Sequence, residues 1–496
     1  MQLPSLGRRD RWVGVAVSAN DLKFYIDGAW VEPVVPSTRE IVNPATEQTI
    51  GAISMGSAAD VDRAVAAARA AFRSHGQTSK AERIALFESI VDAYRPRIND
   101  IADTVRSEMG AHAAFAHSFH AAAPIDTLLR MVEILKTYEF GRQQGTTLIM
   151  REPIGVCGLI TPWNAPIASV VGKMTPALAA GCTVVVKPSE IAPLSPIILA
   201  EILDRAGVPK GVFNLVNGDG ATVGQRIAEH PDVDMVSFTG STRAGVLVAK
   251  AAADSVKRVQ QELGGKSANI ILPDADVEKV VAAGLQRCYV GAGQSCQAPT
   301  RMLVHISQQT RAMQVAKSAA EAFKVGDPRA ADTTMGPVAS KAQYEKVQRL
   351  IAAGIEEGAT LVTGGLGRAT GLERGFYVRP TVFANVGRRM KIAQEEIFGP
   401  VLSILPYESE EDAIAIANDT IYGLAGWVYS GDLDHARRVA MRLRTGRVYL
   451  NGAAPDPAAP FGGYKHSGNG REGGIFGLEE YLEVKALLGN ALPAVA

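Results

Sequence analysis

The sequence predicts an α/β protein with a doubly wound parallel sheet, a second α/β domain and a small β arm. Three features predict this class. Short, fully apolar segments alternate with helical segments between residues 154 and 261, a second alternation follows to about residue 468, and a segment able to form a projecting hairpin lies at 134–152. Strands that are apolar throughout are typical of parallel sheets covered by helices on both faces.

The composition is that of an ordinary soluble protein. The 496 residues are enough for two or three domains, with 47% hydrophobic and 21% charged residues. The 51 basic and 51 acidic residues cancel, which argues against a nucleic-acid partner and against attraction to anionic membranes. Residues 1–21 are too interrupted in hydrophobicity for a secretory signal, and no run approaches the roughly 20 apolar residues of a spanning helix. We therefore expect a cytoplasmic protein.

The first elements are two amphipathic helices, at 57–76 and 80–110, whose apolar residues recur at helical spacing. The layer that they cover begins at residue 154. Its four apolar strands, each followed by a helical segment, lie at 154–163, 183–189, 212–218 and 234–241. Successive βαβ units of this kind form a parallel sheet with right-handed crossovers.

A second series of apolar strands and helices starts at 267–290 and continues through 411–430, so this region needs a core of its own. Between the first helices and the first parallel strand, a helix leads into the possible hairpin at 134–152. The C-terminal segment 477–488 is amphipathic and fits either a strand or a helix. We expect the hairpin and this segment to pair between subunits.

The four cysteines form neither a dense disulfide framework nor a CxxC pair, so we expect reduced thiols and no metal site. Cys157, Cys182 and Cys288 lie among apolar residues, where cysteine behaves as a small hydrophobe. Cys296 differs, because it stands in GAGQSCQAPTR, a run of small and polar residues that no packed helix or strand would choose. The segment indicates either an ordinary loop thiol or an accessible nucleophile.

The glycine-rich segments give mixed evidence for a nucleotide site. ELGGKSA does not fit a P-loop, since the first glycine of that motif would fall at Gln260, and Gly218, Gly220 and Gly224 miss the GxGxxG spacing. FTGSTRAG is more informative, because it follows an apolar strand and opens a helix at Ser241, where backbone N–H groups would face an anion.

Lys187 and Glu190 follow the carboxyl end of a predicted parallel strand, the edge where open α/β sheets bind ligands. The Glu190 carboxylate can accept hydrogen bonds from both hydroxyls of a ribose and would repel a 2′-phosphate, which favours NAD over NADP. A solvated loop glutamate is the alternative.

Eight motifs, in family order and spacing from about residue 24 to 486, resemble the aldehyde dehydrogenase superfamily. They are PWNAP, KPSE, FTGSTRAG, ELGGKSANII, GQSCQAPTR, EEIFGPV, YGLAGWVYS and PFGGYKHSGNGRE. The resemblance implies NAD as cofactor, a small-molecule aldehyde as substrate and a homodimer or homotetramer. It also implies an NAD-binding domain, a catalytic domain and an oligomerisation arm, which we place at 1–133 with 153–261, at 262–468, and at 134–152 with 479–496.

The resemblance further implies covalent chemistry at Cys296. A thiolate, stabilised by backbone donors, adds to the aldehyde carbonyl, and the resulting thiohemiacetal can expel the hydride that a free aldehyde cannot. Asn164 and the backbone N–H of Cys296 match the family's oxyanion donors. Glu262 matches the general base that activates water for thioester hydrolysis. Glu472 is similar to a proton-relaying glutamate; the alternative is a surface glutamate paired with Arg471.

The same resemblance assigns nine residues to the cofactor. Glu396 and Phe398 match residues that hold the nicotinamide ribose and ring. The residues assigned to the adenosine and pyrophosphate side are Trp163, Lys187, Glu190, Gly220, Gly224, Gly240 and Ser241.

The substrate pocket departs from the family pattern. Ala165, Gly172 and Val290 stand where many relatives carry larger side chains, so we expect a wide tunnel and a bulky or aromatic aldehyde. No arginine enters these segments, which argues against a dedicated ω-carboxylate semialdehyde. The other predicted pocket residues are Ser295, Gln297 and Phe461.

Other functions stay open at this point. A semialdehyde or CoA-acylating enzyme of the same family would also use Cys296, although transfer to CoA has less need of Glu262. A non-catalytic protein of this fold would lack the thiol, the amide or the base, and all three are present. An unrelated cysteine hydrolase needs a histidine partner, yet neither His305 nor His466 lies in a motif that suggests a Cys–His pair.

Overall fold

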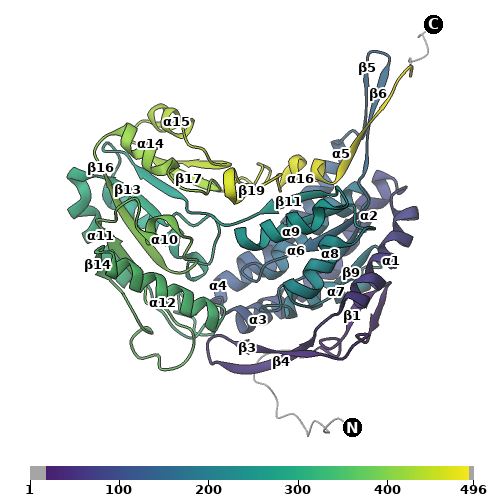
Figure 1. The fold of residues 1–496 in the computed structure, drawn as a ribbon, viewed down its shortest axis with the longest axis horizontal. Helices are drawn as coiled ribbons and strands as arrows, with labels where there is room; N and C mark the ends of the chain where they lie inside the picture. Colours follow the sequence, from purple (N-terminus) through teal and green to yellow (C-terminus); the bar gives the residue numbers. More distant parts are fainter. Residues whose placement is uncertain (1–17, 491–496) are drawn as a thin grey trace.

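The computed structural model describes residues 18–490, which form two lobes side by side and a thin projecting sheet (Figure 1). One lobe carries an eight-stranded sheet, the other a seven-stranded sheet, and the projection has three strands. The sequence-based predictions that concern 1–17 and 491–496, including the ends of the N-terminal domain and of the arm, lie outside the described residues. No described helix combines the length and the apolar character that crossing a membrane requires.

The parallel core of the eight-stranded sheet consists of the predicted βαβ strands and one further strand. Its order is β19-β11-β10-β7-β8-β9-β1-β2, so the order reverses between β7 and β10. Strands on either side of this point send their connections to opposite faces, which leaves a crevice at the carboxyl edge of the sheet. The parallel strands are β7 (Val156–Ile160), β8 (Thr183–Lys187), β9 (Phe213–Leu215), β10 (Met235–Thr239) and β11 (Arg258–Glu262). Antiparallel strands close both edges: β1 (Phe24–Ile26) with β2 (Ala29–Val31), and β19 (Gly468–Asn469).

The N-terminal helical region has three helices where the sequence predicts two. The segment 80–110 is interrupted at Pro96, which has no backbone N–H to donate and turns the chain through a short 3-10 segment, Arg95–Arg97. The Ser79 hydroxyl accepts from the N–H of Glu82, whose carboxylate bonds back to Ser79, a capping box that fixes the start of the second helix. The three helices are α1 (Ala58–His75), α2 (Lys80–Tyr94) and α3 (Ile98–Met109).

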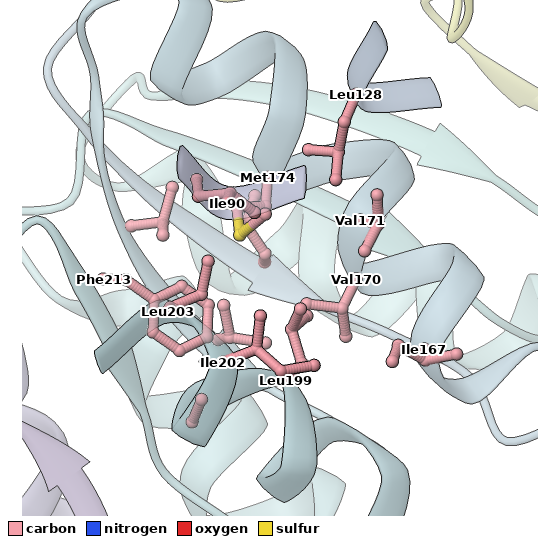
Figure 2. Close-up of a cluster of buried hydrophobic side chains, with 14 of the residues drawn as sticks. Ile90, Leu128, Ile167, Val170, Val171, Met174, Leu199, Ile202, Leu203 and Phe213 are labelled. Carbon is pink, nitrogen blue, oxygen red and sulfur yellow. The ribbon is translucent and has the colours of Figure 1, made fainter. Parts of the chain in front are cut away.

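Two apolar clusters join these helices to the sheet: α2 and α3 pack in the larger one, and α1 packs in the second with α8 (Gln225–Glu229) and α9 (Thr242–Ala253). Figure 2 shows the centre of the larger cluster, where α6 (Pro166–Ala180) and α7 (Leu194–Arg205) interdigitate over β9 with α2 and α5 (Ala123–Thr137). Each large aliphatic side chain that is buried there contributes about 1.5–3 kcal/mol to the stability of the fold. The labelled residues are Ile90, Leu128, Ile167, Val170, Val171, Met174, Leu199, Ile202, Leu203 and Phe213.

The second lobe has a separate core around the seven-stranded sheet, ordered β14-β15-β16-β13-β12-β17-β18. Its strands are β12 (Ala268–Ile271), β13 (Arg301–His305), β14 (Thr360–Thr363), β15 (Thr381–Ala384), β16 (Val401–Tyr407), β17 (Ala425–Tyr429) and β18 (Arg447–Leu450). Its helices are α10 (Val277–Tyr289), α11 (Gln309–Glu321), α12 (Lys341–Glu356), α13 (Lys391–Gln394), α14 (Glu410–Asn418) and α15 (Leu433–Ala440).

The projecting sheet joins the hairpin to the C-terminal segment. Its order is β20-β6-β5, formed by β5 (Gly141–Gln144), β6 (Thr147–Pro153) and β20 (Leu482–Leu487). The C-terminal segment, which fits either a strand or a helix by sequence, is both: α16 (Gly474–Glu480) leads into β20. Tyr481 and Leu482 pack in the core of the first lobe, so the base of the projection is anchored there. A separate two-stranded sheet comprises β3 (Thr38–Asn43) and β4 (Gln48–Ser54).

We expect Arg301→Lys to destabilise the protein by about 2–4 kcal/mol, because the Arg301 guanidinium is buried and donates to the carbonyls of Lys266, Ile416 and Ala417 at 2.7–2.9 Å. The last two carbonyls end α14, and an ammonium cannot reach all three acceptors. The measurement is the thermal denaturation midpoint. Arg438→Lys on the exposed face of α15 is the matched control, and equal midpoints for the two variants would contradict the structural role.

Candidate active site

A cavity of about 450 Å³ lies between the lobes at the carboxyl edge of the eight-stranded sheet. Trp163 and Asn164 enter it from the end of β7, Gly240 and Ser241 from the end of β10, and Glu262 from the end of β11. The second lobe supplies the opposite wall through two loops, at 294–297 and 396–398. The crevice at the reversal of strand order is therefore the place where the predicted residues meet.

Cys296 lies in the loop that leads into β13, and its side chain lines the cavity. The loop follows a tight turn in which Gly291, Ala292 and Gly293 all have positive φ angles of 58–72°. Gly293 is needed for a further reason, since an added Cβ would lie 2.2 Å from the carbonyl oxygen of Gly399. The glycines of the segment thus let the backbone fold back against the second lobe and present the thiol.

Burial raises the pKa of the Cys296 thiol well above its ordinary value, and the nearby carboxylates of Glu396, Glu262 and Glu472 raise it further. The N–H of Cys296 itself opposes this effect only in part. The resting sulfur is therefore a protonated thiol at neutral pH. The backbone donor expected from the sequence therefore acts in the expected direction, against removal from water and three acidic neighbours.

Asn164 is fixed against the cysteine loop. Its Nδ2 donates to the carbonyl oxygen of Gln294 at 3.0 Å, two residues before Cys296. Gln294 is itself held, because its Oε1 accepts from the N–H of Ala339 at 2.8 Å. An amide nitrogen carries two hydrogens, so Asn164 has a second donor to offer to the cavity while the first fixes its orientation.

Glu262 is 2% exposed, and neither of its carboxylate oxygens has a hydrogen-bond partner among the described residues. Burial raises its pKa well above the ordinary value, repulsion from Glu472 adds to this, and Lys173 and Arg471 oppose it. An added Cβ on Gly462 would lie 2.7 Å from Oε1, so only glycine there leaves room for this carboxylate. A buried acid with a raised pKa and free lone pairs is suited to accept a proton.

Glu472 pairs with Lys173 of α6, whose Nζ lies 2.5 Å from its Oε1 and is almost fully buried. The same Nζ donates to Ser237 at 2.9 Å. The backbone of Glu472 exchanges two hydrogen bonds of 2.7 Å with Phe461, and both residues line the cavity. The carboxylate is thus placed between the cavity and a buried ammonium, in contrast to the alternative of a surface pair with Arg471.

Glu396 and Phe398 lie together at the second-lobe wall. A carboxylate oxygen of Glu396 accepts from the N–H of Gly265 at 2.9 Å, and burial raises its pKa. Phe398 has a φ of 59°, unusual for a residue other than glycine, and its ring meets that of Trp163 edge to face at 5.4 Å. Such conformations cluster at ligand sites, where the surroundings hold them.

The other predicted cofactor residues form two groups on the same sheet edge. Ser241 caps α9 by accepting from the N–H of Ala244, and Gly240 donates to the carbonyl of Glu262 at 3.0 Å. The second group, Lys187, Glu190, Gly220 and Gly224, does not line the cysteine cavity.

The second group gathers around a buried cation. Lys187 Nζ donates to the Gly218 carbonyl at 2.8 Å and lies 3.4 Å from Glu190, and burial lowers its pKa. An added Cβ on Gly224 would lie 3.6 Å from the Lys187 side chain, so this glycine borders the same group. Gly220 begins a turn that Asp219 caps through the N–H of Thr222 at 2.7 Å.

Five of the six predicted substrate residues line the cavity: Ala165, Val290, Ser295, Gln297 and Phe461. Gln297 is tied to the second lobe, because its Oε1 accepts from the Tyr449 hydroxyl at 3.1 Å. Gly172 is not among the lining residues. It lies one turn beyond Ser169 on α6, and an added Cβ would meet open space.

The cavity also contains residues that the sequence analysis missed. Gln343 of α12 donates to the carbonyl of Phe398 at 2.8 Å, and Lys346, one turn later, lines the wall near Glu396. Phe115 and Phe119 stack on each other with ring centroids 4.9 Å apart and line the opposite end. The i, i+3 spacing of polar residues on α12 is the sequence signal for the first pair; no local motif marks the two phenylalanines.

Histidine and metal chemistry find no support at this site. No histidine of the described part of the chain lines the cavity, and His305 bonds to Ser307 and to the carbonyl of Glu408 instead. Residues 18–490 contain no cluster of side chains suited to hold a metal ion. A Cys–His hydrolase therefore has no geometric basis here.

The fold and the cavity define an α/β protein that carries a cysteine in the crevice of a doubly wound sheet. The Aldehyde dehydrogenase family profile matches residues 30–487. A "3-succinoylsemialdehyde-pyridine dehydrogenase" from Pseudomonas sp is 55% identical over 468 residues, which span 94% of this chain and 98% of that protein. The chain belongs to the aldehyde dehydrogenase family, and the resemblance and the α/β fold class predicted from the sequence are confirmed.

Two solved structures are similar over nearly the whole chain. A mutant of aldehyde dehydrogenase C from Pseudomonas syringae, complexed with NAD+ and octanal, is 50% identical with a TM-score of 0.96, covering 97% of this chain and 99% of that one. Betaine aldehyde dehydrogenase from Staphylococcus aureus, in complex with NAD+, is 38% identical with a TM-score of 0.92, covering 96% of each chain.

Because Glu262 is buried, its ionised carboxylate should destabilise the folded protein. Because its folded pKa is raised, its stabilising contribution is complete below the unfolded pKa of about 4.3 and is lost as pH rises through the folded pKa. Glu262→Gln should therefore raise the denaturation midpoint at pH 8 by at least about 2 °C, roughly 1 kcal/mol, with the gain shrinking towards pH 5. Thermal denaturation followed at both pH values checks this. Exposed Glu88→Gln is the control, and a lower midpoint for Glu262→Gln at pH 8 would refute the assignment.

Proposed function

We propose that this protein oxidises an aldehyde to the carboxylic acid with NAD+ as hydride acceptor. The observation that carries the proposal is the meeting of Cys296, Asn164 and Glu262 in one cavity at the reversal of strand order. Family membership supports it, as do the related structures that were solved with NAD+.

The residues around the cavity fit NAD+. The first-turn N–H groups of α9, behind the Ser241 cap, suit a pyrophosphate. Glu190 and Glu396 offer carboxylates for the two riboses, and the edge-to-face pair of Trp163 and Phe398 borders a space suited to a flat ring. Bound NAD+ supplies a hydride acceptor, and a carboxylate at Glu190 disfavours the extra phosphate of NADP.

In the proposed reaction, the Cys296 sulfur attacks the aldehyde carbon and the thiol proton leaves. Because the resting thiol is neutral, a base must take this proton, and Glu262 is the candidate with free lone pairs. Asn164 Nδ2 and the N–H of Cys296 stabilise the oxyanion that forms. Loss of hydride from the carbon leaves a thioester on the sulfur.

Water then attacks the thioester and yields the acid and the free thiol. Before this step, Glu262 releases the thiol proton, for which the pair of Glu472 with Lys173 offers a way out of the cavity. Glu262 then accepts the proton of the attacking water and returns it to the departing sulfur. A buried base beside the sulfur supports hydrolysis over transfer to CoA. We therefore place the CoA-acylating alternative second.

We propose an aldehyde with a bulky apolar or aromatic body. Beyond the catalytic groups, the substrate end is lined by Met109, Phe115, Phe119, Ala165, Val290 and Phe461. No arginine of the described chain lines the cavity, which supports our preference over an ω-carboxylate semialdehyde. The name of the Pseudomonas sp relative refers to a semialdehyde that bears a pyridine ring. A ring-bearing semialdehyde is therefore the alternative substrate within this proposal.

We also propose a cytoplasmic homodimer or homotetramer with the domain boundaries predicted from the sequence. The projecting sheet supports assembly, because β20 is an edge strand whose Val484 and Leu487 are exposed. The exposed apolar side chains of Val246 and Leu247 on α9 offer a second surface of this kind.

We expect NADH absorbance to appear when the protein is mixed with NAD+ and an arylaldehyde, with kcat/KM above that for acetaldehyde. Cys296→Ala should abolish the signal. Asn164→Ala should lower kcat about 10²–10³-fold, because one preorganised oxyanion donor is lost. Wild-type activity in Cys296→Ala would remove the proposed nucleophile, and a ratio favouring acetaldehyde would refute the substrate class.

Rapid mixing tests both steps in which we propose that Glu262 acts as the base. Glu262→Gln should slow thiol attack as well as thioester hydrolysis, so that the first NADH per active site forms more slowly without a burst and steady turnover falls at least about 10²-fold. Glu88→Gln, on the exposed face of α2, is the control. Steady turnover at an unchanged rate would show that Glu262 is not the base for hydrolysis.

A further inference from the structure

A second apolar groove, of about 430 Å³, lies beside the substrate end of the cysteine cavity. Segment 112–118, the end of α10 and the end of α11 contribute its walls, with Tyr289, Ala319 and Phe323 among the lining residues. Within the described chain, none of the lining side chains is Asp, Glu, Lys or Arg. Burial lowers the pKa of His112 and raises that of Tyr289, the two titratable rings of the lining, so the groove is uncharged at neutral pH.

The groove adjoins the active-site cavity. Phe115 and Val290 line both spaces, so these two side chains form the partition between them. Val290 is 44% exposed and Phe119, at the cavity mouth, is 44% exposed. Such exposure of large apolar side chains around a catalytic mouth marks a surface that is suited to cover an apolar ligand.

The partition is held in a defined orientation. The Phe115 ring stacks on Phe119 with an interplanar angle of 5°, and both rings meet the edge of His120 at 4.9–5.0 Å. His120 is fully buried, and burial lowers its pKa to about 3, so it remains a neutral packing group. Phe119 and His120 lie in a π-helical stretch, Ala116–Ala122, a distortion frequent at functional sites.

We propose that the groove is a distal subsite that binds the hydrocarbon tail of a long-chain aldehyde while its carbonyl lies at Cys296. This inference rests on the proposed aldehyde oxidation and adds the place where the tail of the substrate is bound. A straight alkyl chain fits a narrow, uncharged groove beyond a partition of two side chains. Each methylene transferred from water into the groove can raise kcat/KM up to about fourfold.

The test fills the groove without touching the catalytic cavity. Ala319 on α11 lines the groove but not the cavity, so Ala319→Trp places an indole where the tail would lie. Lys317→Trp, on the exposed face of the same helix, adds the same side chain outside the groove. The measurement is the ratio of kcat/KM for decanal to that for propanal, followed by NADH absorbance.

We expect the wild-type ratio to exceed about 100, Ala319→Trp to lower it at least about tenfold, and Lys317→Trp to preserve it. Ala319→Leu, a smaller insertion, should give an intermediate ratio and serves in its place if circular dichroism shows Ala319→Trp to be unfolded. An unchanged ratio in the groove variants, with activity intact, overturns the distal subsite alone. Absence of NADH with every aldehyde overturns the proposed function, and the subsite falls with it.

Discussion

The site depends on one topological constraint, the reversal of strand order between β7 and β10. The chain leaves β7 towards one face of the sheet and β10 towards the other, so the carboxyl ends of these strands are not covered by a crossing connection. Asn164 and Ser241 reach the same crevice only because each follows one of these strands. β11, next to β10, adds Glu262, and the second lobe closes the crevice with the Cys296 loop.

The electrostatics of the site follow from this closure. The same removal from water raises the pKa of the Cys296 thiol and of the Glu262 carboxyl, so each group holds a proton more tightly than it would in water. Lys173, buried beneath the sheet edge, partly offsets the acidic cluster through its pair with Glu472. A thiol whose pKa is raised is less open to adventitious oxidation, because the thiolate is the reactive form.

The two ends of the cavity differ in chemistry. The sheet edge carries backbone donors and carboxylates, whereas Phe115 and Val290, which also border the neighbouring groove, are apolar. A polar cofactor and an apolar substrate body can therefore approach Cys296 from opposite directions. The small side chains at Ala165 and Val290 leave room that the stacked Phe115 and Phe119 then shape into an aromatic wall.

The sequence by itself determined the strands of the doubly wound sheet and the loop nature of the Cys296 segment, because apolar runs, helix caps and glycines act within a few residues. The break between α2 and α3 is also a local effect, caused by Pro96. It was missed in the sequence analysis because the apolar residues keep a helical spacing on both sides of the proline. Only the tertiary structure decided that Lys173 is the partner of Glu472, 299 residues away, and that Phe115 lines the cavity. It also decided that the C-terminal segment changes from α16 to β20, since pairing with β6 supplies hydrogen bonds that no local pattern predicts. Such contacts join segments that are far apart in the sequence, so they form only when the chain folds and these segments pack together.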